Sequence, residues 1–329
     1  DWSSDVCSSD LKRIEAIDQF RGFTIIGMVL ANYLAGVRSA PPWLRHADDI
    51  GLTVIDLVAP FFIFAIALTY RPSFLRRLER TGWPHTLWHF FRRYTAIAGI
   101  GFLIHVFEEA TGIGHVRMWW GVLETIGAAG LLTLFVIWAP TAVRLVLAVA
   151  MLVGYQFLLD QGGWLEIVLH SSHGGMHGAV AWTAMLVLGT VLADWYHHEE
   201  KGRRVFPWAS LALLLIGLAL MWWFPISKSR VSSTFVLVST GIGGLLFWAF
   251  HLYAARHEGR LKLLVAWGAN PLFLYIVHLL VLAVYDIPPV PWWFHEAPMW
   301  LVALQITFLL GSMSWLAAVM HRREVILSL

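Results

Sequence analysis

Long apolar segments dominate the chain and recur at intervals typical of transmembrane helices. A helix that crosses about 30 Å of hydrocarbon needs about 20 mostly apolar residues. Ten segments approach this length, at residues 19–37, 53–70, 94–109, 119–138, 142–159, 179–196, 206–224, 235–254, 262–286 and 299–320. Only three residues, Ala139 to Thr141, separate the fourth segment from the fifth, which predicts a tight helical hairpin. The pattern predicts an all-α, polytopic membrane protein with about ten helices in one bundle.

The composition agrees with this fold class and excludes several others. The 329 residues are 58% hydrophobic and 13% charged, whereas an average soluble chain is about 25% charged. A water-soluble domain of this length would need a more highly charged surface. Disorder and a disulfide scaffold are also excluded, and a net charge of only +2 indicates no nucleic-acid partner.

The first eleven residues, DWSSDVCSSDL, resemble the translation of a sequencing adapter and are set apart from the fold prediction. We therefore expect the native N-terminus to be missing and residues 12–329 to form a single transmembrane domain. The one cysteine, Cys7, lies in the adapter-like segment. Without it the chain has no thiol nucleophile and no disulfide.

The positive charges predict the orientation. Lys and Arg are enriched in cytoplasmic loops of membrane proteins. With a cytoplasmic N-terminus, all but five of the 23 Lys and Arg fall on the cytoplasmic side. The five on the other side are Arg38, Arg45, Arg117, Lys228 and Arg230. Both termini are therefore expected on the cytoplasmic side of the membrane.

The first candidate site is in the first predicted hairpin. Asn32 lies near the outer end of the first helix, His46 lies in the outer loop, and Asp56 lies about one turn into the second helix. Asp56 could accept a hydrogen bond from one ring nitrogen of His46 and leave the other free as a base or nucleophile. Asn32 could stabilise a carbonyl oxygen. Alternatively, Asn32 and Asp56 only join helices, and His46 is a solvated loop residue.

The second candidate site is in WGANPLFLYIVH. Pro271 is suited to a first helical position with Asn270 as the N-cap, so the helix should break at residues 268–270. Irregular backbone inside a membrane is tolerated where it is buried in protein or lines a cavity. His278 follows on the same helix, either facing this cavity or as a satisfied core histidine.

Other polar residues are weaker candidates. Glu124, with Glu108 and Glu109, could form an acidic vestibule that attracts an amine-bearing substrate, or a solvated helix rim. Arg21 could pair with Asp18 three residues earlier, or meet a phosphate. The HSSHGGMH segment at 170–177 is a poor zinc motif, so no metal is expected.

Several motifs together resemble the heparan-α-glucosaminide N-acetyltransferase family and its bacterial relatives. The resemblance is most specific in RIEAIDQFRGFTIIGMVLANYLAG and WLRHADDIGLTVIDLVAPFFIFAIAL, with an Asp-x-x-Arg-Gly helix, a His-Ala loop and an Asp before Pro-Phe-Phe. Supporting matches are GVLETIG, FPISKSRVSSTFVLVSTG and WGANPLFLYIVH. Glu124 replaces the family's Gln, and Ser227 replaces the Asn before Lys228. Together they cover nearly all of residues 12–320.

The resemblance implies transfer of an acetyl group across the membrane, from cytosolic acetyl-CoA to an amino sugar on the periplasmic side. It implies a catalytic role for His46 with Asn32 and Asp56. Asn270 and His278 would complete the site at the acceptor. Separately from the resemblance, we expect Glu124 to face the acceptor, and Arg21 and Lys228 to be phosphate or carbonyl contacts of the acetyl-CoA. The predicted orientation independently places His46 outside.

Four questions stay open on the sequence. His46 could carry the acetyl group covalently or act as a base in a ternary complex. The acceptor could also be the hydroxyl of a cell-envelope glycan, since bacteria generally lack heparan sulfate. A multi-pass transporter is the alternative from another class, because transporters also have broken helices and intramembrane acids. The oligomeric state is open, a homodimer included.

Overall fold

The computed structural model describes residues 15–112, 120–198, 200–257, 261–288 and 290–327. The adapter-like segment with Cys7 lies outside these residues, as does Arg117. Within them the regular secondary structure is helical, as predicted. The α-helices are α1 (Glu15–Ala35), α2 (Val58–Thr111), α3 (Val122–Leu134), α4 (Thr141–Asp160), α5 (Trp164–Leu169), α6 (Gly175–His197), α7 (Glu200–Leu220), α8 (Ser233–Arg256), α9 (Lys262–Ala269), α10 (Pro271–Asp286) and α11 (Met299–Arg322).

Among the described helices, six are long and apolar enough to cross a membrane, namely α2, α4, α6, α7, α8 and α11. A seventh span is obtained if α9 and α10 count as one helix bent by 86°. The predicted count of ten is therefore not confirmed. The charged first turns of α1 keep it out of this set, and α3, with 13 residues, is about 20 Å long and shorter than the hydrocarbon layer.

The long helix α2 folds back on itself at Gly82, where the backbone has φ 73° and ψ 175°. The rings of Tyr70 and Phe90 stack with centroids 5.3 Å apart, although 20 residues of straight helix would separate them by about 30 Å. Glycine suits this position because it has no Cβ to clash at positive φ. This one element therefore contains residues 58–70 of the predicted segment 53–70 and all of the predicted segment 94–109.

The break between α9 and α10 occurs where Pro271 predicts it. Asn270 occupies the N-cap position, but its side chain makes no capping hydrogen bond there. The break brings α9 against α1 so closely that a Cβ on Gly22 would lie 1.9 Å from the carbonyl oxygen of Leu264. A Cβ on Gly268 would lie 2.0 Å from the carbonyl oxygen of Asp18. Two glycines therefore permit backbone-to-backbone packing at this crossing.

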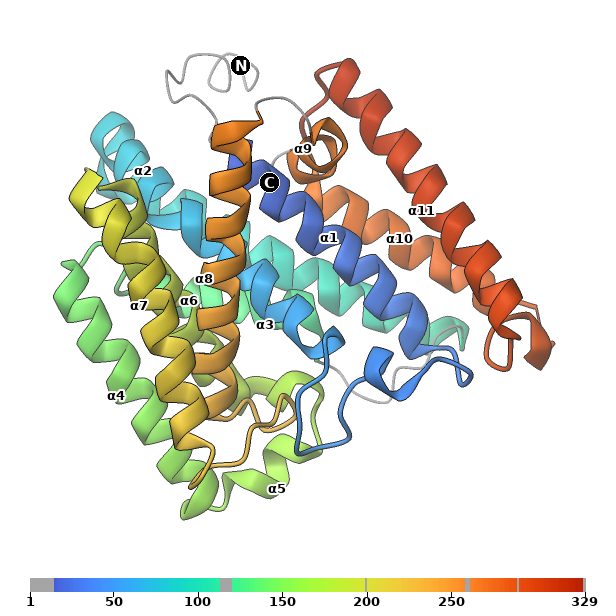
Figure 1. Ribbon diagram of the computed structural model, residues 1–329, viewed down its shortest axis with the longest axis horizontal. Coiled ribbons are helices and arrows are strands. Elements are labelled where there is room, and N and C mark those ends of the chain that lie inside the picture. The colour runs from blue at the N-terminus through green and yellow to red at the C-terminus, as the bar shows by residue number, and fades with distance from the viewer. Residues whose placement is uncertain (1–14, 113–119, 199, 258–260, 289, 328–329) are drawn as a thin grey trace.

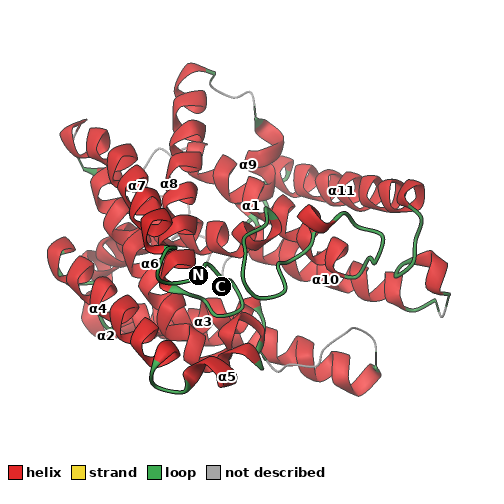
Figure 2. Ribbon diagram, turned by 60° about the horizontal axis from the view of Figure 1, so that its bottom comes forward, coloured by secondary structure: helices red, strands yellow, loops and turns green. Residues whose placement is uncertain are grey.

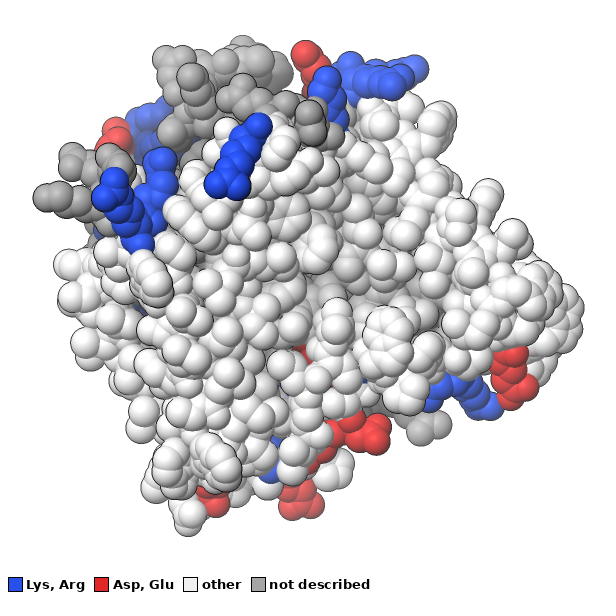
Figure 3. All heavy atoms as spheres, viewed as in Figure 1, with Lys and Arg blue, Asp and Glu red and all other residues white. Residues whose placement is uncertain are grey.

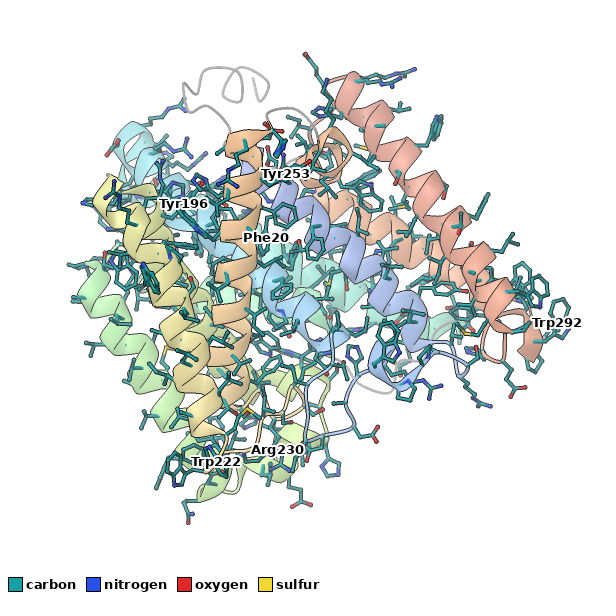
Figure 4. The ribbon with its side chains drawn as sticks, viewed as in Figure 1. Phe20, Tyr196, Trp222, Arg230, Tyr253 and Trp292 are labelled. Atoms are coloured by element: carbon teal, nitrogen blue, oxygen red, sulfur yellow. The ribbon has the colours of Figure 1, made fainter. Side chains whose placement is uncertain are left out.

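The helices form one bundle (Figures 1 and 2). Its centre is buried, and many large apolar side chains are exposed on its outside. The apolar stretch of α6 is 83% buried, whereas those of α7 and α11 are 17% and 28% buried. Phe20 on α1 packs in the interior against rings from α2 and α8, whereas Trp222 and Trp292 lie near the periphery (Figure 4). Outward apolar faces of this kind are what a helix in contact with lipid requires.

Charge separates the two ends of the bundle. We call the end where α1 begins and α11 ends the terminal end; the loop of residues 36–57 and α5 lie at the opposite end (Figure 1). Most visible Lys and Arg side chains cluster at the terminal end, and acidic side chains are prominent at the opposite end (Figure 3). This is the asymmetry that the loop charges predict for a cytoplasmic terminal end.

Candidate active site

The loop between α1 and α2 places His46 against Asp56. Nδ1 of His46 lies 2.7 Å from Oδ1 of Asp56, as expected from the sequence. Oδ2 accepts hydrogen bonds from the backbone N–H of Thr53 (3.0 Å), its hydroxyl (2.9 Å) and the N–H of Ala47 (3.2 Å). The Asp56 side chain is fully buried, and these donors compensate the loss of water around a carboxylate. Asp56 therefore orients the ring and leaves Nε2 as the nitrogen with the free lone pair.

Lys228, in the loop between α7 and α8, adds a positive charge to this pair. Its Nζ lies 3.1 Å from Nδ1 and 3.3 Å from Nε2 of His46, and 3.9 Å from Oδ1 of Asp56. The two ring nitrogens point in different directions within the ring plane, so an ammonium almost equidistant from both lies over the ring face. The sequence predicted Lys228 as an acetyl-CoA contact; in the structure its partners are His46 and Asp56.

A second set of contacts holds the two loops together. Arg230 Nε donates to both oxygens of Asp49 (2.8 and 3.0 Å), and the Ser227 hydroxyl donates to Oδ1 (2.9 Å). Arg230 is labelled at the opposite end of the bundle in Figure 4. The turn that carries Lys228 ends at Val231, whose φ of 50° is unfavourable for a β-branched residue. The turn is thus fixed by packing, because Val231 would not adopt this conformation by itself.

Burial shifts the titration of both basic groups. Loss of water around the imidazole lowers the pKa of His46, against the raising effect of its hydrogen bond to Asp56, and the ammonium of Lys228 lowers it further. Burial also lowers the pKa of Lys228 to about 8, although Asp56 favours its charged form. At neutral pH the arrangement therefore combines a neutral imidazole with a mostly protonated lysine.

Asn32 does not contact the His46 pair but another predicted residue. Its Nδ2 lies 2.9 Å from Nε2 of His278, which fits an amide N–H donating to the ring lone pair. His278 is fully buried, and the ring of Tyr275 packs against it with centroids 4.8 Å apart. Asn32 also lines a cavity of about 250 Å³ together with Glu108 and Asp286. Asn32 was predicted to lie with His46 and Asp56, but in the structure it contacts His278 of the second candidate site, and this contact joins α1 to α10.

Glu124 is paired with a histidine that sequence reasoning missed. Its Oε1 lies 2.7 Å from Nδ1 of His105 on α2, and its Oε2 accepts from the backbone N–H of Gly121 (3.0 Å). Both side chains are largely buried, so this is a second histidine–carboxylate pair in the bundle. The signal for His105 was available, because it is an ionisable residue within the predicted segment 94–109.

A larger cavity, of about 430 Å³, lies nearer the terminal end and is named here the arginine-lined cavity. Arg21, Arg76 and Arg93 line it, and its apolar wall includes Leu123 and Ile126 on α3. Arg21 Nη1 also lies 3.1 Å from Oδ1 of Asp18, so the ion pair expected from their spacing forms at the cavity wall. A cavity with several guanidinium groups is suited to phosphate.

Asn270 lies beside this cavity, and its amide is engaged by the chain itself. Its Nδ2 donates to the carbonyl oxygen of Val325 (2.8 Å), and its Oδ1 accepts from the N–H of Leu327 (2.7 Å). The sequence predicts Asn270 as a contact of the acceptor; in the structure both ends of its amide pair with the backbone of residues 325 and 327. Across the described residues, no group of three or more His, Cys, Asp or Glu is arranged to hold a metal ion.

Comparison with known proteins gives consistent matches. The family model described as heparan-alpha-glucosaminide N-acetyltransferase, catalytic, matches residues 13–253. Similar curated proteins are the heparan-alpha-glucosaminide N-acetyltransferases of Mus musculus, 32% identical over 80 residues, and of Homo sapiens, 38% identical over 68 residues. These alignments cover 24% and 21% of this chain, and only 12% and 10% of the two relatives.

Proposed function

Because the chain belongs to the heparan-alpha-glucosaminide N-acetyltransferase catalytic family, we propose that it is an acetyl-CoA-dependent acetyltransferase of a bacterial inner membrane. The acetyl group would pass to an amino sugar or a related glycan on the periplasmic side. The observation that carries this proposal is the Asp56–His46–Lys228 arrangement, in which an oriented imidazole has a buried ammonium over its face. Such a group can act on an acyl carbon without a metal or a thiol.

The arginine-lined cavity supports acetyl-CoA as the donor. Guanidinium groups pair well with phosphate oxygens, and Arg21, Arg76 and Arg93 would hold the phosphates of the nucleotide. Leu123 and Ile126 provide an apolar wall for the less polar arm that carries the thioester. The cluster of positive charges at the terminal end favours a cytoplasmic orientation for this cavity, with both termini inside.

His46 has two possible roles in the transfer, and both require its neutral form. In one, Nε2 attacks the thioester carbonyl carbon and the C–S bond breaks with its electron pair moving to the CoA sulfur; the acceptor amine then attacks the acetyl carbon, the C–Nε2 bond breaks, and the proton lost by the amine passes to the released Nε2. In the other, the amine attacks the thioester directly, Nε2 takes its proton, and the C–S bond breaks with its electron pair moving to the CoA sulfur, which is protonated in turn. In each, the ammonium of Lys228, 3.3 Å from Nε2, would stabilise the negative charge that develops on the carbonyl oxygen.

The cavity lined by Asn32, Glu108 and Asp286 supports an amine-bearing acceptor. The two carboxylates in its lining attract a cationic amine more than a neutral hydroxyl, which favours N-acetylation over O-acetylation. His278 on α10 contacts Asn32, which lines this cavity, and Glu124 on α3 pairs with His105. Both would shape the acceptor side of the site, and neither belongs to the His46–Asp56 pair.

The test is acetyl transfer by the purified protein in detergent. Radiolabelled acetyl-CoA would be incubated with a panel of amino sugars, with hydroxyl-only glycans as comparison. His46→Ala should abolish transfer to every acceptor, whereas His170→Ala, at an exposed histidine of the same end, should leave it unchanged. Label retained on the protein without acceptor, and lost in His46→Ala, would identify the covalent route. Full transfer by His46→Ala would refute the proposal, and solute uptake into proteoliposomes without transfer would favour the transporter alternative.

A further inference from the structure

The chain reverses direction immediately after α11. Glu324 has a φ of 55°, in the left-handed region where glycine is normally favoured. The N–H of Glu324 donates to His321 O (3.2 Å), and the N–H of Val325 donates to Met320 O (3.0 Å). This is the pattern of a Schellman motif, with a non-glycine residue at the left-handed position. The reversal sends residues 325–327, named here the C-terminal strap, back toward the break between α9 and α10.

Asn270 holds the strap by both ends of its amide. Its N–H donor and its carbonyl acceptor pair with the backbone of Val325 and Leu327, in the way one strand pairs with another. Asn270 is 1% exposed and has no capping bond to α10, so these two hydrogen bonds are what satisfy its side chain. An asparagine is specific here because it offers a donor and an acceptor side by side.

The strap forms part of the wall of the arginine-lined cavity. Ile326 and Leu327 are among its lining residues, together with Pro271 and Arg21. Yet the strap is only loosely packed, because the side chains of Val325, Ile326 and Leu327 are 39%, 39% and 54% exposed. Two side-chain hydrogen bonds and partial apolar contact are weak restraints compared with helix packing, so this piece of wall can open without unfolding the bundle.

We propose that the C-terminal strap is a removable wall of the arginine-lined cavity, that Asn270 is its latch, and that a large anionic ligand enters by displacing the strap. The identity of that ligand as acetyl-CoA rests on the proposed function, whereas the opening of the wall does not. Asn270 is then a positioning residue, acting on ligand access through the strap.

Cysteine accessibility tests the opening directly. Cys7 is the single cysteine of the chain, so Cys7→Ser gives a cysteine-free background in which Thr69→Cys places one thiol in the cavity wall. Its reaction with a charged methanethiosulfonate reagent reports access to the cavity. Asn270→Ala should increase the labelling rate about tenfold, as expected for loss of two ordinary hydrogen bonds. Leu327→Pro, which deletes one N–H donor and leaves α9 and α10 untouched, should increase it by a smaller factor.

Glu324→Gly is the matched control, because it relieves the left-handed turn and leaves the latch intact. It should label no faster than the background, and thermal unfolding in detergent should show that all variants are folded. Unchanged labelling in both Asn270→Ala and Leu327→Pro would overturn the proposal. Acetyl-CoA at increasing concentration should protect the thiol; faster labelling of the latch variants without this protection would support the removable wall and count against acetyl-CoA as its ligand.

Discussion

The charge on Lys228 should control the alkaline limit of acetyl transfer. With a pKa of about 8, about nine-tenths of the lysine is protonated at pH 7 and about one-tenth at pH 9. If the ammonium stabilises the developing oxyanion, its contribution to the rate falls almost tenfold between these two pH values. The titration of His46 does not cause this fall, because burial lowers the pKa of His46 and the imidazole is already neutral at pH 7. The activity should therefore fall on the alkaline side through loss of the lysine charge.

Lys228→Arg and Lys228→Met separate charge from shape. Arginine stays protonated across this range, so Lys228→Arg should keep its activity at pH 9 relative to pH 7. Methionine has no charge at any pH, and Lys228→Met should lose about 10²- to 10³-fold in kcat, the usual cost of removing one donor to an oxyanion. The absolute activity of Lys228→Arg need not match the original, because the guanidinium is broader than the ammonium.

The assay is the initial rate of acetyl transfer to one amino sugar from pH 6 to pH 10. The acceptor amine also titrates in this range, so the informative quantity is the ratio of the Lys228→Arg rate to that of the unmodified protein at each pH. This ratio should rise about tenfold between pH 7 and pH 9. A ratio that stays flat, or a Lys228→Met variant with full activity, would refute the assigned role of the ammonium.

Three further predictions follow from single contacts. Asp56→Asn should lower kcat by about two to four orders of magnitude, because an amide no longer fixes the imidazole tautomer; transfer kinetics at unchanged protein content would reveal this, and a near-normal kcat would contradict it. Gly22→Ala should lower the thermal stability in detergent by about 1–3 kcal/mol, since its Cβ would meet the carbonyl of Leu264 at 1.9 Å. Asp194→Ala should cost about 3–5 kcal/mol, because it removes the carboxylate partner of the fully buried Arg144; an unchanged melting temperature would exclude either stability argument.

Local features of the fold were readable from the sequence only in part. The break before Pro271 was predictable because proline cannot continue a helix. The connection before α4 is longer than predicted: residues 135–140 separate α3 from α4, and Thr141 is already the first residue of α4. The number of spans was not predictable either. Residues 119–138 form one apolar run and were predicted as one span, but α3 ends at Leu134. Hydropathy measures how apolar a segment is, and it does not report where the helical backbone ends.

The site was predictable only where its residues are close in the chain. His46 and Asp56 are ten residues apart, and one loop can bring them together. The contact of Asn32 with His278 joins residues 246 positions apart, and depends on how α10 crosses α1. The partner of Asn270 is a backbone segment without a motif, so no pattern of residue types could reveal it.

The contact between Lys228 and His46 has a consequence for how the protein is made. The two residues are 182 positions apart, so a ribosome adding 5–20 residues per second synthesises the lysine roughly ten to forty seconds after the histidine. During that interval the nascent chain holds the imidazole and its carboxylate without the ammonium. The proposed acyl chemistry therefore requires that the loop before α8 has been made and has docked against the first loop. Chains that end before this loop would carry the His46–Asp56 pair without the ammonium of Lys228.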